Sequence, residues 1–382
     1  MDFELTQEQK ILRNTVRDFA EKEIKPFAAE LDEKQEFSYE IEEKMANLGI
    51  MGLPFPEKYG GVGADYLSYI IAVEELARVD ASSAATMCAH TSLGTMPIYY
   101  FGTEEQKQEW LPKLASGKML GSFGLTEPNA GSDAGGTQTK AVLKDGFWTI
   151  NGSKCFITNA GTKISGIVTI TAVTGIRKDG KKEIECILVP RGTEGYNIGP
   201  HYNKMGWRWS DTRELSFEDC RVPEGNLLGE RGHGLSQMLQ ILDGGRLSIG
   251  AMGLGGAQGA FEMALKYSKE RHQFGKPISS FQVNAFKLGD MLTEIELARL
   301  ILYKAAWLKD NKKPFSRESA MAKLVCAETM GRTVNQALQL HGGYGYIKEY
   351  PIERFYRDHK ILDIGEGTNE IQRVVISRSI GC

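Results

Sequence analysis

The positions of the hairpin-type turn pairs constrain the fold most, because these pairs are confined to the middle of the chain. Asp145-Gly146, Asn151-Gly152 and Asp179-Gly180 separate short segments that are rich in β-branched and aromatic residues. Short strands joined by such turns are typical of antiparallel sheets. We therefore predict an antiparallel sandwich or barrel of roughly 110 residues in this part of the chain.

Helical patterns flank this block on its N-terminal side. Thr6 with Gln9 has the spacing of a capping box, and Thr103 with Gln106 repeats it before another helix. Apolar residues recur near the helical period behind each of these positions. The first third of the chain is therefore expected to be helical.

Three long helical patterns follow the central block, over 235–271, 282–309 and 318–341. Together they predict a four-helix bundle with a shorter helix near the end of the chain. The expected fold class is α+β, with an N-terminal helical domain (1–119), a middle β domain (120–230) and a C-terminal bundle domain (231–382).

Charge and cysteine usage exclude several classes of function. The 46 basic and 49 acidic residues leave a net charge of −3, which argues against nucleic-acid binding by an overall positive field. The six Cys form no CxxC pair and the six His are dispersed, so we expect reduced thiols in a cytoplasmic protein and no metal site. No signal-peptide pattern or membrane-spanning apolar run is seen, so no membrane contact is expected.

Glycine is the compositional outlier, with 43 residues among 382, about one and a half times its usual ~7%. Glycine makes turns, or it lets backbone approach a ligand closely. The loop after Leu125, with Thr126, Gly131 and Ser132, exposes donors that suit a flavin ring edge or a diphosphate. An ordinary tight loop is the alternative, and this segment leaves both open.

The segment from Lys154 to Gly161 pairs an aromatic residue, Phe156, with a hydroxyl, Thr158. Such a ring packs on a planar cofactor, while the hydroxyl bonds its edge. A core phenylalanine in a strand is the alternative, and it is favoured if this segment stands alone.

Paired glycines in a predicted long helix mark the sequence from Asp243 to Arg246. Gly244 and Gly245 each cost about 1 kcal/mol against Ala in a helix, so a ligand or another backbone must approach there. A surface pair between Asp243 and Arg246 is the alternative for the two charges. The glycines that follow at 253–259 do not match GxGxxG and indicate close helix packing, which disfavours a nicotinamide dehydrogenase.

Two further segments combine glycine or aromatic residues with polar groups. Arg271 stands near Phe274 and the pair Phe281-Gln282, where a guanidinium suits a diphosphate, or caps a helix C-terminus instead. The helix end that begins at Gln339 carries more glycines than a C-cap needs, so a ligand or a neighbouring subunit is expected to lie close.

Glu366 lies between two glycines just before a helix capped by Thr368 or Asn369. A carboxylate on such a low-bulk loop is readily desolvated by a ligand, as a general base for a carbon acid requires. An ordinary loop acid beside a capping residue is the alternative, and it is favoured on this segment alone.

Taken together, these segments resemble the acyl-CoA dehydrogenase family over essentially the whole chain. The likeness is greatest to its bacterial short-chain, butyryl-CoA-type members, in Gly60-Gly61, in 102–107 and in 350–354. The resemblance implies the same three-part fold, a homotetramer with one FAD per subunit, an acyl-CoA substrate, and an electron-transferring flavoprotein as the electron acceptor.

The resemblance also implies roles by position. Residues that would hold the isoalloxazine and ribityl parts of FAD are Phe123, Leu125, Thr126, Gly131, Ser132, Phe156, Ile157 and Thr158, with Phe156 in place of the family's usual Trp. The diphosphate and adenine would be reached by Arg271, Phe274, Phe281 and Gln282, and across a subunit interface by Gln339, Leu340, His341, Gly342 and Gly343. Residues that would close over the dinucleotide are Thr368, Asn369 and Glu370. Acyl-CoA would contact Ser132, Asp243, Gly244, Gly245, Arg246, Gly365 and Gly367.

Glu366 matches the family's catalytic base, which takes the α-proton while flavin N5 takes the β-hydrogen as hydride. The backbone N–H at Glu366 and a ribityl hydroxyl would polarise the thioester carbonyl. The position of the base in some other members is here Gly245. Gly365 stands where most straight-chain members carry Tyr, so we hypothesise a branched or alicyclic acyl group such as a cyclohexane-carbonyl thioester, or repacking by Trp207 or Trp209.

Two other functions remain open on the sequence. An acyl-CoA oxidase, or a monooxygenase-like flavoenzyme on the same fold, would differ in the reaction of its reduced flavin with oxygen. A CoA-binding oligomer without activity is the second alternative, and the flavin loops and Glu366 argue against it.

Overall fold

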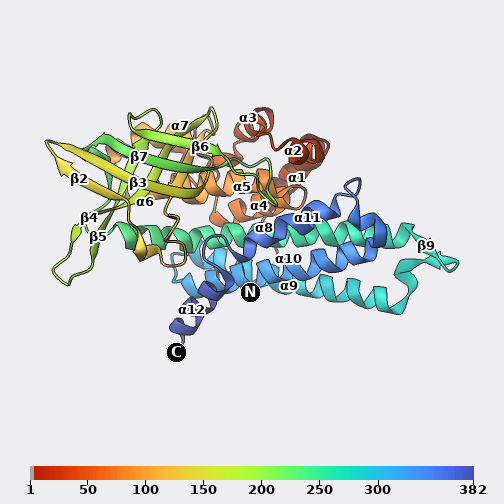
Figure 1. Ribbon diagram of the computed structural model, residues 1–382. Coiled ribbons are helices and arrows are strands. Elements are labelled where there is room, and N and C mark those ends of the chain that lie inside the picture. Colours follow the sequence, from red (N-terminus) through yellow and green to blue (C-terminus); the bar gives the residue numbers. More distant parts are fainter. Residues whose placement is uncertain (1–3) are drawn as a thin grey trace.

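The computed structural model describes residues 4–382, and the order of its elements is helical, then β, then helical. The expected α+β class is confirmed. In Figure 1 the N-terminal helices lie over the middle of a long helical bundle, and the β sheet lies at one end of it. The bundle extends away from the sheet to a small two-stranded hairpin at its far end.

The N-terminal region is helical as predicted, and both capping boxes are present. Thr6 and Thr103 each accept a hydrogen bond from the backbone N–H three residues on, and the side chains of Gln9 and Gln106 bond back. The α-helices of this region are α1 (Gln7–Phe19), α2 (Ala28–Lys34), α3 (Tyr39–Asn47), α4 (Tyr66–Ala77), α5 (Ala81–Cys88), α6 (Met96–Phe101) and α7 (Glu104–Ala115). Shorter turns are the π-helical η1 (Ala20–Ile24) and η4 (Ala89–Thr95) and the 3-10 segments η2 (Ile50–Gly52) and η3 (Glu57–Tyr59).

The middle region forms one connected sheet. Its strands are β1 (Leu120–Gly124), β2 (Lys140–Lys144), β3 (Phe147–Thr158), β4 (Ser165–Ile176), β5 (Lys182–Pro190), β6 (Tyr196–His201), β7 (Thr212–Pro223) and β8 (Leu227–Leu228). Two 3-10 turns, η5 (Ala134–Gly136) and η6 (Glu224–Asn226), lie between strands. The strand order is β6-β7-β3-β2-β4-β5-β8, with β1 beside β4. The expected antiparallel arrangement is wrong at two places, because β4 pairs in parallel with β1 and, at one residue pair, with β2.

Two of the three predicted turn pairs are confirmed. Asp145-Gly146 joins β2 to β3 with positive φ at both residues, and Asp179-Gly180 lies between β4 and β5. The prediction for Asn151-Gly152 is wrong, because β3 runs straight through it. A Cβ at Gly152 would lie 2.6 Å from Thr139 Oγ1, so this glycine allows close approach within the sheet instead of a turn.

The C-terminal region is built on three long helices, α8 (Gly234–Glu270), α9 (Gln282–Asp310) and α10 (Ser316–His341). The smaller elements are β9 (His272–Gln273), β10 (Lys276–Pro277), η7 (Ile278–Ser280), η8 (Gly342–Tyr346), α11 (Ile352–Asp358), η9 (His359–Asp363) and α12 (Asn369–Ser379). Within residues 4–382, no helix combines the length and apolarity needed to cross a membrane.

The glycines of α8 serve close packing, as the sequence predicts. A Cβ at Gly253 would lie 2.9 Å from the backbone of Cys326 on α10. On another face, a Cβ at Gly255 or Gly259 would collide with carbonyl oxygens at the end of α4. Helix α8 therefore packs directly against backbone on both sides.

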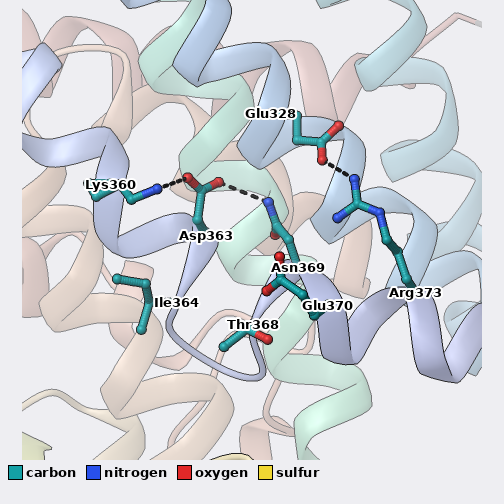
Figure 2. A pocket seen from close by; sticks show the side chains of 8 residues that line it. All are labelled: Glu328, Lys360, Asp363, Ile364, Thr368, Asn369, Glu370 and Arg373. Atoms are coloured by element: carbon teal, nitrogen blue, oxygen red, sulfur yellow. Dashed lines mark hydrogen bonds and ion pairs between the residues drawn. The ribbon is translucent and has the colours of Figure 1, made fainter.

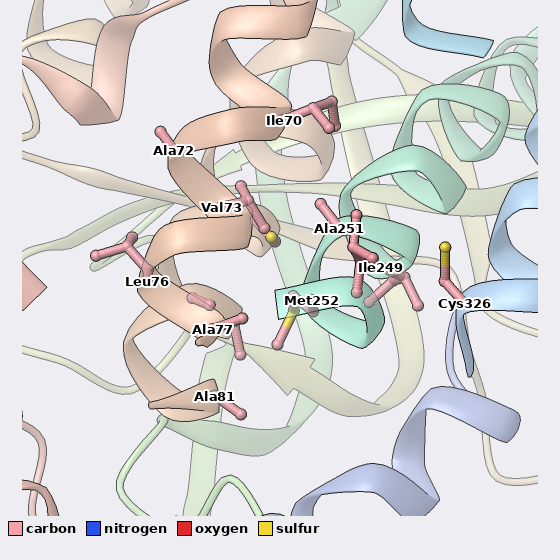
Figure 3. Close-up of a cluster of buried hydrophobic side chains, with 14 of the residues drawn as sticks. Ile70, Ala72, Val73, Leu76, Ala77, Ala81, Ile249, Ala251, Met252 and Cys326 are labelled. Atoms are coloured by element: carbon pink, nitrogen blue, oxygen red, sulfur yellow. The ribbon is translucent and has the colours of Figure 1, made fainter. Parts of the chain in front are cut away.

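One apolar core joins the first and last parts of the chain. Figure 3 shows Val73 and Ala77 of α4 facing Ala251 and Met252 of α8, with Cys326 of α10 on the other side of α8. The sheet has its own core, in which Trp148, Ile150 and Phe217 are almost completely buried. A third cluster joins the sheet to the helices, because Ile167 and Leu188 of the sheet pack with Leu111 of α7 and Met238 of α8.

Candidate functional site

Glu366 lies on the short loop between η9 and α12, and its backbone is left-handed. Its φ is 52°, and the following Gly367 has a φ of 88°. A non-glycine residue with positive φ is uncommon and marks strain that the surroundings must hold. The Oε2 atom of Glu366 is buried and has no hydrogen-bond partner. The sequence places a carboxylate here, and the structure adds that its side chain points into the protein with one oxygen free.

Helix α8 faces this carboxylate with a glycine. A Cβ on Gly245 would collide with Glu366 Oε2 and lie 3.1 Å from Leu93 Cδ2. The sequence predicts that a ligand or another backbone approaches Gly245, whereas the structure brings the side chain of Glu366 there. Burial raises the pKa of Glu366 to about 8, although Arg246 and Lys323 oppose the rise.

Two sets of contacts hold the loop that carries Glu366. Gln372 Nε2 donates to the carbonyl oxygen of Gly367 at 2.8 Å and more weakly to that of Glu366 at 3.3 Å. Thr368 caps α12 by accepting from the N–H of Ile371, as predicted for Thr368 or Asn369. The second set of contacts is made by the side chain of Asn369, which bonds to Lys323 and to Asp363.

Asn369 connects the loop to a buried lysine and to a surface ion pair. Lys323 Nζ, fully buried on α10, donates to Asn369 Oδ1 at 2.9 Å, and Asn369 Nδ2 donates to Asp363 at 2.9 Å. Asp363 in turn pairs with Lys360 at 2.9 Å, and Figure 2 shows these last two contacts. Lys323 was not among the residues singled out in the sequence.

A cavity of about 470 Å³ lies beside this chain of contacts and is lined largely by charged groups (Figure 2). It contains the three residues expected to close over a dinucleotide. The lining residues are Glu328, Lys360, Asp363, Ile364, Thr368, Asn369, Glu370 and Arg373.

The residues predicted from Asp243 to Arg246 lie early in α8, where their charges pair. Arg246 Nη1 is 2.5 Å from Asp243 Oδ1, which also accepts from Ser316. Arg246 is buried and its Nε has no hydrogen-bond partner. The backbone oxygen of Gly244 accepts from the Tyr66 hydroxyl at 3.0 Å. The charges are thus paired, as the alternative interpretation proposed, but beside Glu366 instead of on the surface.

The two predicted segments of the β region lie against each other. The N–H of Cys155 donates to the carbonyl oxygen of Thr126 at 2.9 Å. After Thr126 the chain makes a tight turn, in which the backbones of Glu127 and Ala130 exchange two hydrogen bonds. Phe156 has a φ of 59° and is 66% exposed, with its ring centroid 5.3 Å from that of Tyr202. The prediction of a core phenylalanine at this position is therefore not what the structure shows.

Several hydroxyls of these segments are free. Thr126, Ser132 and Thr158 make no side-chain hydrogen bond within residues 4–382. A Cβ at Gly131 would meet nothing within 4 Å, so the loop borders open space. Three other predicted contacts are partly or wholly in the core: Phe123 is half-buried, and Leu125 and Ile157 are buried.

A buried ion pair that the sequence analysis missed joins the same two segments. Lys154 of β3 is completely buried, and its Nζ is 2.7 Å from Glu127 Oε1. Burial raises the pKa of Glu127, but Lys154 and hydrogen bonds from Thr137 and Gln138 outweigh it and hold that pKa well below its ordinary value. Lys154 falls on the same alternation as the buried Trp148 and Ile150, which was an available signal.

A second cavity, of about 570 Å³, lies near the far end of the bundle. It is lined by Arg271 together with Leu340, His341, Gly342 and Gly343. The structure thus groups Arg271 with 340–343 on one copy, whereas the resemblance implies that 339–343 reach the dinucleotide from a neighbouring subunit. The rings of Tyr267 and His341 stack there with centroids 4.4 Å apart.

The other predicted residues near this cavity lie outside its lining. Phe274 is 92% exposed in the β9–β10 turn and packs edge-on against Phe281, with centroids 6.0 Å apart. Gln282 begins α9 and is exposed, as is Gln339. In Figure 1 this hairpin lies at the end of the bundle away from the sheet. One copy of the chain therefore holds the predicted dinucleotide residues in two separate places.

Comparisons with known proteins agree over almost the whole chain. Family models match at residues 6–118 (acyl-CoA dehydrogenase, N-terminal domain), 122–220 (middle domain) and 232–381 (C-terminal domain). The probable acyl-CoA dehydrogenase YngJ of Bacillus subtilis (strain 168) is 55% identical over 380 residues, with 100% of both chains covered.

Two solved structures have the same fold at full length. Butyryl-CoA dehydrogenase from Megasphaera elsdenii is 46% identical, with a TM-score of 0.96 and 100% of both chains covered. A chain from a study of the electron transferring flavoprotein of Acidaminococcus fermentans is 45% identical, with the same TM-score and coverage. The likeness therefore extends over the helical and the β regions alike.

Proposed function

The chain belongs to the acyl-CoA dehydrogenase family, and from this premise we propose that Glu366 is the base that removes the α-proton of an acyl-CoA thioester. The protein is an oxidoreductase that acts on acyl-CoA, and its reaction is dehydrogenation between the α- and β-carbons of the acyl group. The observation that carries the assignment to Glu366 is its buried, unpartnered Oε2 on a strained loop.

Burial makes Glu366 a stronger base than a surface carboxylate. Its pKa of about 8 lies near neutrality because burial disfavours the charge, while Arg246 and Lys323 keep the ionised form accessible. Gly245 leaves the space that the carboxylate occupies. The backbone N–H of Glu366 is our proposed donor to the thioester oxygen, where it would stabilise the charge that develops as the proton leaves.

The residues of the β region fit FAD, the cofactor on which this family depends. The free hydroxyls of Thr126, Ser132 and Thr158 offer donors at the edge of open space, and the exposed ring of Phe156 offers a stacking surface. When bound, FAD supplies the acceptor for the β-hydrogen, as hydride at N5.

The other predicted cofactor residues would hold the rest of the dinucleotide. Arg271 with 340–343 suits a diphosphate or an adenine, because a guanidinium and open glycine backbone line the same cavity as the stacked Tyr267 and His341. Residues 368–370 line the cavity beside Glu366. Because these two places are separate in one copy, we infer that a second copy completes the site.

We infer a homotetramer from two observations, which are the separation of the dinucleotide residues within one copy and the apolar surface of α9. This helix exposes several large apolar side chains, more than a surface helix ordinarily shows. They are Val283, Phe286, Leu292, Leu297, Leu300 and Trp307. Light scattering coupled to gel filtration tests the assembly, and a monomer at micromolar concentration would contradict it.

The electron acceptor that we infer is an electron-transferring flavoprotein, since a chain from a study of such a protein shares this fold at 45% identity. We also infer a cytoplasmic setting. The six cysteines are unpaired, and five of them are buried, as expected of thiols kept reduced.

Gly365 carries our inference about the acyl group. A Cβ at this position would meet only Ile361, so the space next to the base is open. Neither predicted replacement fills it: Trp209 is buried in the helical core, and neither its side chain nor that of Trp207 lies within 4 Å of that Cβ. We therefore infer a short acyl chain that is branched or alicyclic at the α- or β-carbon, such as a cyclohexane-carbonyl thioester.

Reduction of the bound flavin by a set of acyl-CoA thioesters tests both inferences. The Glu366→Gln variant should be reduced at least about 10²-fold more slowly, because it lacks the base, whereas Glu349→Gln, an exposed control with the same charge change, should match the parent. If Glu366→Gln is reduced as fast as the parent, Glu366 is not the base.

The same assay decides the acyl group. The parent should reduce fastest with 2-methylbutyryl-CoA or cyclohexane-carbonyl-CoA, and Gly365→Tyr should shift the preference towards butyryl-CoA by filling the open space. Turnover of butyryl-CoA far above that of the branched and cyclic thioesters in the parent would contradict the open-pocket inference while leaving the role of Glu366 intact.

A further inference from the structure

We propose that the buried ion pair of Lys154 and Glu127 is a positioning device for the cofactor. It fixes the loop that carries Thr126 against the distorted end of strand β3 that carries Phe156 and Thr158. The free groups on the two segments are thereby held at a constant separation. This inference rests on the proposed FAD site and assigns a role to two residues that do not themselves line it.

The ammonium of Lys154 connects three parts of the sheet. Besides Glu127 at 2.7 Å, it donates to Thr171 Oγ1 of β4 at 3.0 Å and lies 3.5 Å from the carbonyl oxygen of Leu125. Leu125 and Glu127 flank Thr126 in the sequence. One side chain of β3 therefore contacts the loop on both sides of Thr126.

The carboxylate of Glu127 holds the far end of the same loop. It accepts from the hydroxyl of Thr137 and from the backbone N–H groups of Gln138 at 2.7 Å and Thr139 at 3.1 Å. The segment from 126 to 139, which includes Gly131 and Ser132, is thus closed by one carboxylate. Lys182 of β5 adds a second tie at this end, donating to the carbonyl oxygens of Gly136 at 3.2 Å and Thr137 at 2.8 Å. Because 128–135 are mostly exposed, the contacts at the two ends set the loop's course.

Strand β3 changes its register directly after Lys154. Its pairing with β7 shifts between Lys154 and Ile157, and within this bulge Phe156 takes a left-handed φ of 59° and turns outward. Bulges are found next to active sites, where they redirect a side chain. Lys154 therefore lies at the point where the bulge begins and the loop meets it.

Simple stabilisation does not account for this pair. Taking two charges out of water is costly, and apolar residues of similar volume often serve a core as well or better. The rest of the sheet core is largely apolar, and buried threonines such as Thr137 and Thr171 contact the pair. An ion pair that is hydrogen-bonded to five further residues fixes direction and distance, which apolar contacts do not, and here it does so beside three free hydroxyls.

The test uses the full-length protein loaded with FAD and measures the rate of FAD release, from the fluorescence of free flavin, together with the melting temperature. Lys154→Met and Glu127→Gln should each release FAD at least about ten-fold faster, comparable to the effect of outer partners on bound metal ions. The double variant Lys154→Met/Glu127→Gln balances the charges, so its melting temperature should return towards that of the parent. Its FAD release should stay fast, because the side-chain contacts from β3 to the loop are still missing and only the backbone bond between Cys155 and Thr126 remains.

Trp148→Phe is the matched control, since Trp148 is buried in the same sheet but far along β3 from the bulge. It should lower the melting temperature and leave FAD release unchanged. If the double variant releases FAD at the parental rate, or if Trp148→Phe accelerates release equally, the pair is only structural and this inference is wrong. A parent chain that binds no FAD would overturn the proposed function as well, so the two failures are distinguishable.

Discussion

Two carboxylates that point into the protein, each with a buried lysine nearby, behave in opposite ways in this molecule. In the sheet, Glu127 is in direct contact with Lys154 at 2.7 Å, and its pKa is held well below its ordinary value against the effect of burial. In the bundle, Lys323 donates to the neutral amide of Asn369, and Glu366 keeps a free oxygen and a pKa raised by burial.

The difference lies in the partner of each lysine. A lysine in contact with a carboxylate fixes the charge of that carboxylate and its geometry, which suits a structural role. A lysine held by an amide places a cation near the reactive group without forming an ion pair with it, and burial lowers the pKa of Lys323 to about 8. Glu366 can therefore take up a proton near neutral pH, whereas Glu127 cannot.

The largest expected difference is in stability. Lys154→Met leaves the carboxylate of Glu127 buried without its cation and should lower the free energy of unfolding by about 3–5 kcal/mol. Lys323→Met leaves only the neutral Oδ1 of Asn369 without its donor and should cost about 1–3 kcal/mol. Urea unfolding of both variants measures the two losses. An equal or reversed order would remove the distinction between the two lysines.

A difference of opposite sign is expected in the pH dependence of stability. The folded pKa of Glu127 is about 2 against 4.5 for the free carboxyl, so its contribution is present above pH 4.5 and is lost as the pH falls towards 2. The folded pKa of Glu366 is about 8, so its contribution is present below pH 4.5 and is lost as the pH rises through 8.

Unfolding curves at a series of pH values compare the variants with the parent. Glu127→Gln should flatten the curve between about pH 2 and 4.5, and Glu366→Gln should flatten it between about pH 4.5 and 8. Each change should be a few kcal/mol at most, at about 1.4 kcal/mol per unit of pKa. A variant that flattens the wrong side would contradict the direction of the shift assigned to its carboxyl.

The smallest expected effect concerns the pH profile of flavin reduction. Lys323→Met removes a positive charge near Glu366, so the pKa of that carboxyl should rise further and the rate should reach its plateau about one pH unit higher. Arg246 of α8 also faces Glu366 and is unchanged in this variant, so the shift should be partial. Lys323→Arg keeps the charge and should restore the profile, and Lys154→Met should not move it.

Much of the fold and the candidate base could be read from local sequence. Capping boxes, helical periods and two of three turn pairs depend on neighbours within a few residues, and these predictions are confirmed. Asn151-Gly152 has the same local signal as a true turn. The extended conformation of these two residues depends on the pairing of β3 with β7, which no local sequence pattern reveals.

The contacts around the candidate site were harder to predict because they join distant residues. Lys154 meets a carboxylate 27 residues earlier, and Lys323 meets an amide 46 residues later. Each lysine does occupy an inward position of its strand or helix, beside buried apolar neighbours. A lysine at such a position signals a buried polar contact, but the partner emerges only from the three-dimensional arrangement.

The glycine-lined contact of α8 with α4 has a consequence for synthesis of the protein on the ribosome. Helix α4 leaves the ribosome long before 234–270 are translated, and the whole sheet is made in between. The apolar face of α4 that Figure 3 shows against α8 is therefore exposed to water for the time taken to translate more than a third of the chain. The nascent N-terminal helices must be kept from aggregating during this interval. Slowed translation or loss of chaperone assistance should therefore reduce the yield of folded protein.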